Sequence, residues 1–216
     1  MPQREKGVVI WFTGLAGSGK STIASGVAQR LAEMGLDVEN LDADIVRANL
    51  SPNLGFSLEA RDENTKRLAW LAQLLSKYGV NVVIAAVATL RYFRDRARSW
   101  CEKFVEVYVD APLEVCMQRD PKGLYARAAR GEVHDVDGIH IPYEEPLNPE
   151  VHLRTDQMSI EECVEAVMQK LFELGYLKTP EAHAATACDS GARAEDGYTD
   201  EQRKQVEERL RGLGYV

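Results

Sequence analysis

GLAGSGKST, residues Gly14 to Thr22, lies between the apolar run GVVIWFT and the segment IASGVAQRLAEMG, whose apolar residues recur at helical spacing. The stretch fits the pattern G-x-x-x-x-G-K-[ST], which is typical of a phosphate-binding loop between a strand and a helix. Its glycines let backbone N–H groups curl around an anion, and the helix that follows adds the positive end of its dipole. We therefore expect this stretch to bind a nucleoside triphosphate.

The polar residues of this glycine loop have separate expected roles. Lys20 is expected to reach the β- and γ-phosphates of ATP, and the Ser21 hydroxyl is expected to bind Mg²⁺. A glycine-rich turn that only caps a helix is the plain alternative, and the strand before the loop and the amphipathic pattern after it argue against that alternative. The residues predicted to contact ATP here are Gly14, Leu15, Ala16, Gly17, Ser18, Gly19, Lys20, Ser21 and Thr22.

Outward from the loop, short apolar runs alternate with longer segments of helical periodicity, such as ENTKRLAWLAQLLSKYG at residues 63–79. The runs lack an alternation of apolar and polar residues, which is typical of strands that are buried on both faces. Strands that alternate with helices through short connections predict a three-layer α/β domain with a parallel sheet of about five strands. The expected strands are Val8–Thr13, Val38–Asp42, Val80–Ala86, Phe104–Asp110 and Val151–Thr155.

Composition narrows the class of protein. The 216 residues, of which 45% are hydrophobic and 28% are charged, suit a soluble globular chain. A net charge of -8 argues against a general nucleic-acid binder. Four widely spaced cysteines without a CxxC pair indicate neither a zinc site nor a disulfide framework. With no signal-peptide pattern and no apolar stretch long enough to span a membrane, we expect a cytoplasmic protein that binds neither nucleic acid nor membrane.

The chain is expected to divide into a domain at residues 1–177, a linker at 178–198 and an amphipathic helical tail at 199–216. The linker is rich in alanine and small polar residues and shows no periodicity. LFELGYL at 171–177 and LRGLGYV at 210–216 share one pattern, in which a glycine suits the left-handed cap of a helix. A lone helix of this length needs a partner surface, on the first domain or on a second subunit, and a homodimer is expected. The apolar stripe of the tail consists of Val206, Leu210 and Leu213.

A second motif, NLDADIVR, places Asp42 and Asp44 at the end of the second expected strand. Ligands bind at the carboxyl ends of the strands in open parallel sheets. One of these carboxylates is suited to hold Mg²⁺ and the other to accept a proton from an attacking hydroxyl, and a pair of solvated loop aspartates is the alternative. Because motifs that read guanine are absent, the pattern favours a small-molecule kinase.

Several stretches together resemble the adenylyl-sulfate kinase family, from about Gly7 to Leu177. They are the glycine loop, LDADIVRANLSPNLGFSLEARDEN, VEVYVDAPLEVCMQRDPKGLYARAARGEV and GIHIPYEEPLNPE. The resemblance implies a P-loop kinase fold with a lid segment, and ATP and Mg²⁺ as cofactors. It further implies transfer of the γ-phosphate of ATP to the ribose 3′-hydroxyl of adenylyl sulfate, a small-molecule nucleotide acceptor, which yields phosphoadenylyl sulfate in sulfate assimilation.

The resemblance also implies roles for individual residues. Asp42 and Asp44 would lie beside Mg²⁺ and the reacting hydroxyl, with Phe56 stacked on the adenine of the acceptor. Residues 119–125, RDPKGLY, resemble the lid that closes over both nucleotides. The implied sets are Lys20, Asp42 and Asp44 for catalysis, Arg119 with the glycine loop for ATP, Ser21 and Asp42 for the metal, and Asp44, Arg47, Phe56, Arg61, Asn64, Lys122 and Leu124 for the acceptor.

Departures from the family pattern gather on the acceptor side. Val136 stands where the family has a second phenylalanine against the adenine, and Ile45 replaces the asparagine of the Asp-Gly-Asp-Asn motif. These changes leave open another nucleotide-linked acceptor, such as a cytidine diphosphate-like compound, or a nucleotide-binding module without catalysis. Retention of the loop lysine and both aspartates speaks against the latter, and which aspartate is the base also stays open. The departures are Ala43, Ile45, Ala88, Val136 and His140.

Overall fold

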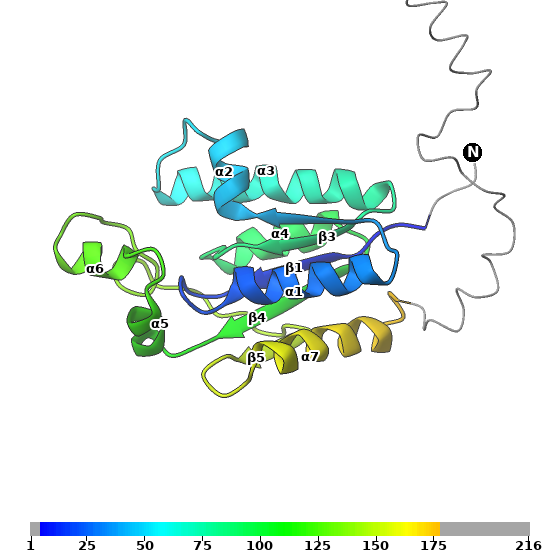
Figure 1. The fold of residues 1–216 in the computed structure, drawn as a ribbon. Coiled ribbons are helices and arrows are strands. Elements are labelled where there is room, and N and C mark those ends of the chain that lie inside the picture. Colours follow the sequence, from blue (N-terminus) through cyan, green and yellow to red (C-terminus); the bar gives the residue numbers. More distant parts are fainter. Residues whose placement is uncertain (1–4, 178–216) are drawn as a thin grey trace, which may run out of the picture. The chain divides into compact units, whose positions relative to one another are not determined.

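The apolar runs pair into one sheet, whose strands are β1 (Val9–Thr13), β2 (Val38–Asp42), β3 (Asn81–Ala85), β4 (Phe104–Asp110) and β5 (Val151–Arg154). Neighbouring strands are all parallel, in the order β2-β3-β1-β4-β5 (Figure 1). The structure is a computed structural model that describes residues 5–177, so the predicted linker at 178–198 and tail at 199–216 lie outside the described residues. The predicted three-layer α/β fold is confirmed, and each strand end lies within one residue of its expected position.

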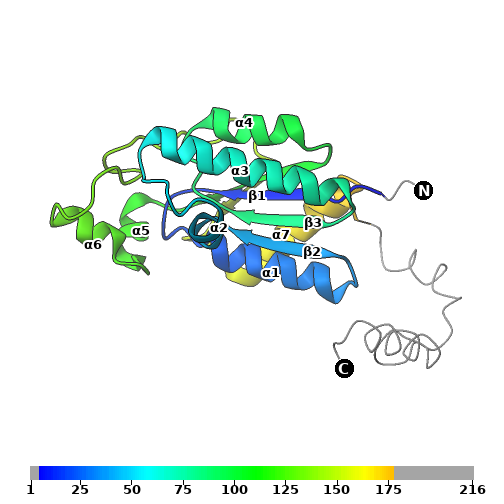
Figure 2. The same ribbon diagram turned by 90° about the horizontal axis from the view of Figure 1, so that it is seen from above.

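The described part of the chain also contains the helices α1 (Lys20–Glu33), α2 (Ala43–Leu50), α3 (Leu58–Lys77), α4 (Arg91–Trp100), α5 (Leu113–Arg119), α6 (Leu124–Ala129) and α7 (Ile160–Glu173). Helices α1 and α7 cover one face of the sheet, and α3 and α4 cover the other (Figures 1 and 2). Alternate residues of β1 serve the two layers, because Ile10 packs with Val27 of α1 and Trp11 packs with Leu68 of α3. A strand between two apolar layers needs apolar residues at every position.

The two edge strands differ from this pattern. In β5, Val151 and Leu153 are buried whereas His152 and Arg154 are exposed, and in β2 only Leu41 is buried. The prediction that the runs are buried on both faces is therefore right for β1, β3 and β4 and wrong for β2 and β5. At the edge of a sheet the helical layers no longer cover both faces, so one face of the strand meets solvent and takes polar residues.

Two loop glycines are required by the fold itself. Gly14 has φ 146°, and a Cβ atom there would lie 2.2 Å from the Val109 carbonyl oxygen at the end of β4. Gly17 has φ 79°, and its Cβ atom would lie 2.9 Å from the Cys116 carbonyl oxygen of α5. Both positions thus combine a left-handed or extended positive φ with a close backbone approach, which other residues do not tolerate.

The predicted helix ends are present where the structure describes them. The leucine-striped segment forms α3, which ends just before Gly79 with φ 92°. Helix α7 is followed by Gly175 with φ 68°, and the N–H of Tyr176 donates to the Leu171 carbonyl at 3.0 Å. These bonds satisfy carbonyls at the end of a helix, as in a left-handed cap. The first copy of the repeated LxxLGY pattern is therefore a helix end, and the second copy lies outside the described residues.

Three of the four cysteines fall within residues 5–177. Cys101, Cys116 and Cys163 are buried and form no disulfide among themselves, and burial raises the pKa of the Cys101 thiol to about 11. No group of three or more His, Cys, Asp and Glu side chains in this range is arranged to hold a metal ion. None of the helices described here is both long and apolar enough to cross a membrane.

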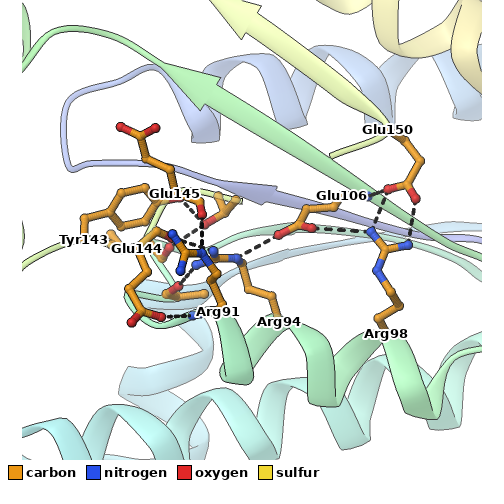
Figure 3. Close-up of polar contacts among 11 residues, drawn as sticks. Arg91, Arg94, Arg98, Glu106, Tyr143, Glu144, Glu145 and Glu150 are labelled. Carbon is orange, nitrogen blue, oxygen red and sulfur yellow. Dashed lines mark hydrogen bonds and ion pairs between the residues drawn. The ribbon is translucent and has the colours of Figure 1, made fainter. Parts of the chain in front are cut away.

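A buried polar network ties helix α4 to the segment that follows α6. Arg94 is only 1% exposed and donates to the Glu106 carboxylate of β4 at 2.8 Å and to the Glu144 carbonyl at 2.6 Å (Figure 3). It also donates to the carbonyl of Ala88, which holds a positive φ of 48°. One guanidinium thus joins the loop after β3, strand β4 and the 143–145 segment.

The neighbouring arginines of α4 extend this network (Figure 3). Arg98 makes two bonds to the Glu150 carboxylate, at 2.7 and 2.8 Å, and one oxygen of Glu150 accepts the Glu106 N–H at 2.7 Å. Arg91 donates its backbone N–H to the Glu144 carboxylate at 2.8 Å. Because charge-assisted bonds of this kind are strong and directional, the segment from 143 to 150 is held firmly against α4 and β4.

Replacing Arg94 by methionine is expected to lower the free energy of unfolding by about 3–5 kcal/mol, because the substitution leaves a buried carboxylate without its main partner. Urea denaturation followed by tryptophan fluorescence measures the change. The double variant Arg94→Met/Glu106→Leu removes the stranded charge as well and should regain part of the loss. Arg130→Met is the matched control, since its ion pair with Glu132 is exposed, and an equal urea midpoint for Arg94→Met and Arg130→Met would contradict the assignment.

Candidate functional site

A cavity of about 850 Å³ opens at the carboxyl ends of β1, β2 and β3, between the glycine loop and the α5–α6 segment. Most of the residues singled out from the sequence line it. They are Ala16, Gly17, Ser18, Gly19, Lys20, Ser21, Thr22, Asp42, Asp44, Phe56, Arg61, Arg119, Lys122 and Leu124. Four others, Gly14, Leu15, Arg47 and Asn64, lie outside this lining.

Lys20 is a buried cation at the base of the cavity. It begins α1, is 8% exposed, and donates to the Leu15 carbonyl at 2.7 Å. Burial lowers the pKa of its ammonium group to about 8, although the carboxylates of Asp44 and Asp137 act in the opposite direction. The Lys20 ammonium group therefore donates to a backbone carbonyl of the glycine loop, and a bound anion can replace that carbonyl as its partner.

Ser21 and Asp42 lie side by side at the mouth of the loop. The Ser21 hydroxyl donates to Oδ2 of Asp42 at 2.7 Å, and Oδ1 of Asp42 accepts the Asp44 N–H at 2.9 Å as the cap of α2. This donor set consists of hydroxyl and carboxylate oxygens, which are the ligands of a hard cation such as Mg²⁺. Since Mg²⁺ usually takes one or two protein oxygens and completes its shell with phosphates and water, Ser21 and Asp42 fit that ion.

Three side chains fasten the glycine loop from outside. Arg119 donates to the carbonyl and hydroxyl oxygens of Thr155 at 2.7 and 3.1 Å. The Thr155 hydroxyl donates to the Ser18 carbonyl at 2.8 Å, and the Tyr125 hydroxyl donates to the Ala16 carbonyl at 2.8 Å. Sequence reasoning missed Thr155 and Tyr125 as site residues. The available signal was position, because Thr155 directly follows β5 at the edge where ligands bind and Tyr125 ends the RDPKGLY motif.

The segment that resembles a lid reaches across the cavity to α2. Lys122 forms an ion pair with Asp44, and this hydrogen bond raises the pKa of the lysine. Both side chains are 68% exposed, so the pair is well solvated and easily separated. Asp120 accepts the Ala126 N–H at 2.9 Å, and these backbone bonds lower the pKa of its carboxyl group. The segment is thus anchored by the bonds from the first turn of α6 to Asp120 and only lightly held at Lys122.

Phe56 presents an aromatic face on the opposite side of the cavity. Its side chain is exposed, and the Arg47 guanidinium carbon lies 4.4 Å from the ring centroid. Arg47 also donates to the Gly55 carbonyl, and its burial followed by the nearness of Arg61 lowers the pKa of its guanidinium. An arginine over the ring on one side favours the ring as a stacking platform.

Arg61 joins the Phe56 loop to the 135–137 segment. Its guanidinium donates to Asp137 Oδ2 at 2.6 Å, and the other Asp137 oxygen accepts the Thr89 hydroxyl at 2.7 Å. Asp137 lines the cavity, is 6% exposed, and was not among the expected site residues. Nearby, Oδ1 of Asn64 is buried without a hydrogen-bond partner among residues 5–177.

The positions that depart from the family pattern differ in whether they line the cavity. Ala43 and Val136 line it, and Val136 is 2% exposed. Nδ1 of His140 accepts the Val136 N–H at 3.2 Å and so shapes the turn at 136–141. Ile45 is 66% exposed and Ala88 lies beneath the wall, bonded to Arg94. Only the first two therefore change the surface that a ligand meets.

Proteins with this arrangement are known. Residues 6–154 match the family model described as Adenylylsulphate kinase, which is more than half of the chain. The adenylyl-sulfate kinase of Rippkaea orientalis is 50% identical over 179 residues, which cover 83% of this chain and 99% of that protein. The range 6–154 that the family model matches contains the glycine loop, Asp42 and Asp44.

Solved structures are similar as well. The APS kinase of Mycobacterium tuberculosis in complex with AMPPNP and APS has a TM-score of 0.75 at 41% identity, over 77% of this chain and 98% of that chain. A hexameric APS kinase from Thiobacillus denitrificans has a TM-score of 0.63 at 34% identity, over 82% of this chain and 31% of that chain. Both likenesses lie well above the level at which only a fold is shared.

Binding of ATP is expected to weaken above about pH 8, because the Lys20 amino group of the free protein has a pKa of about 8 and becomes neutral there. Bound phosphates favour the ammonium form, so binding takes up a proton and the affinity falls by up to about tenfold per pH unit. Calorimetric titration in two buffers of different ionisation enthalpy measures this uptake. Lys20→Arg keeps its charge throughout and should show none, and the same uptake in that variant would assign the proton to another group.

Proposed function

This chain belongs to the adenylyl-sulfate kinase family, and on that premise we propose that it transfers the γ-phosphate of ATP to the ribose 3′-hydroxyl of adenylyl sulfate. The supporting observation is that one cavity brings the glycine loop opposite Phe56 and Arg61, with Asp44 between them. Two nucleotides held in one cavity can be oriented for in-line attack, and this positioning is the main source of catalysis in phosphoryl transfer.

The glycine loop is the proposed site for the phosphates of ATP. Residues 16–22, which include the start of α1, line the cavity, and Lys20 would leave the Leu15 carbonyl for the β- and γ-phosphates. Lys20 then neutralises charge that spreads over the transferred phosphoryl oxygens. Arg119, which already lies against the loop through Thr155, is the second cation of the donor half.

Mg²⁺ is proposed to be held by Ser21 and Asp42 together with phosphate oxygens. When bound there, the ion would neutralise phosphate charge and so favour departure of the γ-phosphoryl group. The Ser21–Asp42 bond keeps both oxygens at the same place before the ion arrives. Because Asp42 also caps α2, its rotamer is fixed from two sides.

Asp44 is proposed as the group that accepts the proton of the 3′-hydroxyl. Both Asp42 oxygens already accept hydrogen bonds, from Ser21 and from the Asp44 N–H, which suits a positioning role. Among residues 5–177, the Asp44 carboxylate has only the exposed Lys122 as a partner, and it lines the cavity. An attacking hydroxyl needs an acceptor within hydrogen-bond reach, and Asp44 is free to be that acceptor once Lys122 swings to the phosphates.

The acceptor is proposed to stack on Phe56, with Arg47, Asn64 and the lid residues Lys122 and Leu124 around it. Arg47 supports the ring from one side, and Oδ1 of Asn64, which is buried without a partner among residues 5–177, can still accept a hydrogen bond. Closing residues 119–125 over both nucleotides would exclude water, which otherwise diverts the phosphoryl group to hydrolysis.

Asp44→Asn is expected to lower kcat for phosphoadenylyl sulfate formation by about 10²-fold or more, since it removes the proton acceptor while keeping the shape. Asp42→Asn should instead raise the Mg²⁺ concentration needed for half-maximal rate. Labelled ATP and adenylyl sulfate measure both, with a cytidine diphosphate-like acceptor as the competing substrate. Glu39→Gln, an exposed change in β2, is the matched control, and unchanged turnover in both aspartate variants would contradict the proposed roles.

We also propose that the chain acts as a homodimer in the cytoplasm. The support is the amphipathic pattern of residues 199–216, whose apolar stripe needs a partner surface. Sedimentation equilibrium of the full chain should give about twice the 24.1 kDa mass of one copy. A mass of one copy at all concentrations would contradict the dimer without affecting the proposed reaction.

A further inference from the structure

All three nitrogen atoms of the Arg61 guanidinium are already engaged by the protein. Nε donates to the Phe56 carbonyl at 2.7 Å, and Nη2 donates to the Asp135 carbonyl at 2.5 Å. Nη1 donates to the Asp137 carboxylate at 2.6 Å, and the Arg61 side chain is only 16% exposed. A guanidinium has five N–H groups in one plane, so three bonds in three directions fix its position completely.

Asp137 is as firmly held as the arginine it pairs with. Its side chain is 7% exposed, and its second oxygen accepts the hydroxyl of Thr89, a residue that is 1% exposed. Thr89 in turn follows Ala88, whose carbonyl is bonded to the buried Arg94. The negative charge of Asp137 is therefore a permanent part of the cavity wall and does not swing in or out.

The two halves of the cavity carry charge differently. In the donor half, Lys20 and Arg119 donate to backbone or hydroxyl oxygens and form no ion pair within residues 5–177. In the acceptor half, Arg47 donates to the Gly55 carbonyl, whereas Lys122 is paired with Asp44 and Arg61 with Asp137. The first of these pairs is exposed and separates easily, but the second is largely shielded from solvent and persists. The positive charge of Arg61 is thus cancelled where an acceptor binds.

We infer that Asp137 is a specificity-determining residue, which neutralises Arg61 and so lowers the affinity of the acceptor half for nucleotides in proportion to their negative charge. This inference rests on the proposed function. The product of that reaction carries one phosphate group more than the acceptor, which adds about 1.5–2 negative charges at pH 7. Asp137 would therefore weaken the binding of product more than that of substrate and favour product release.

Asp137→Asn tests this inference, because asparagine keeps the size, an oxygen to accept from Arg61 and an NH2 group to donate to the Thr89 hydroxyl, but removes the charge. We expect about threefold lower KM for adenylyl sulfate and about tenfold tighter inhibition by phosphoadenylyl sulfate. The difference from wild type should shrink in about 0.5 M KCl, since salt screens the charge. Asp62→Asn is the matched control, because it removes the same charge one residue from Arg61, where the carboxylate pairs with Arg96.

A purely structural role predicts the opposite result. If Asp137 only holds Arg61 in place, Asp137→Asn and Thr89→Val would both raise KM, and the effect would not depend on salt. That outcome, or an equal gain of affinity in Asp62→Asn, would overturn the inference. If Asp137→Asn does not fold, as judged by its thermal unfolding, Asp137→Ser is measured in its place, with the same expected direction.

Binding measurements separate this inference from the proposed function. With the donor half saturated by ADP and Mg²⁺, adenosine 5′-monophosphate and adenosine 3′,5′-bisphosphate are titrated as probes that differ by one phosphate. Asp137→Asn should tighten the bisphosphate several-fold more than the monophosphate even if the protein does not turn over adenylyl sulfate. Failure of turnover alone would contradict the function, whereas an unchanged ratio of the two affinities would contradict the role of Asp137.

Discussion

The parallel direction of all five strands is the constraint on which the site depends. The carboxyl ends of parallel strands lie on the same side of the sheet, so the residues after them meet there although they are far apart in the chain. The glycine loop follows β1, Asp42 ends β2, and Thr155 follows β5. Helices on both faces make this direction possible, because each crossover helix returns the chain from the carboxyl end of one strand to the amino end of the next.

Around the carboxyl ends of the strands, firmly held segments lie beside loosely held ones. The 143–150 segment is tied to α4 and β4 through Arg94 and its neighbours, whereas residues 119–125 touch α2 mainly through an exposed ion pair. A wall that must present Asp137 and Val136 at fixed positions gains from buried charge-assisted bonds. A cover that must admit two nucleotides needs contacts that are easily broken, and a solvated lysine–aspartate pair provides one.

The sequence predicts the layers and the strand positions well, because hydrophobic runs and the glycine loop are local signals. It fails at the edges, since the burial pattern of β2 and β5 depends on where each strand lies in the sheet. It also does not reveal that Arg61 meets Asp137, which is 76 residues away. A solvated arginine and a partly buried arginine in an ion pair look alike in a sequence, and only the folded chain distinguishes them.

The glycines of the loop serve two purposes, close packing against neighbouring backbone and room for a bound nucleotide. At Gly14 a Cβ atom would collide with the Val109 carbonyl, and at Gly17 with the Cys116 carbonyl, in the protein as it stands. Both collisions involve backbone atoms of neighbouring elements and none of a ligand. An alanine at either position would thus reduce folding or solubility of the protein, even in cells that do not need the kinase activity. Intolerance to substitution in this loop measures chain packing first and nucleotide contact second.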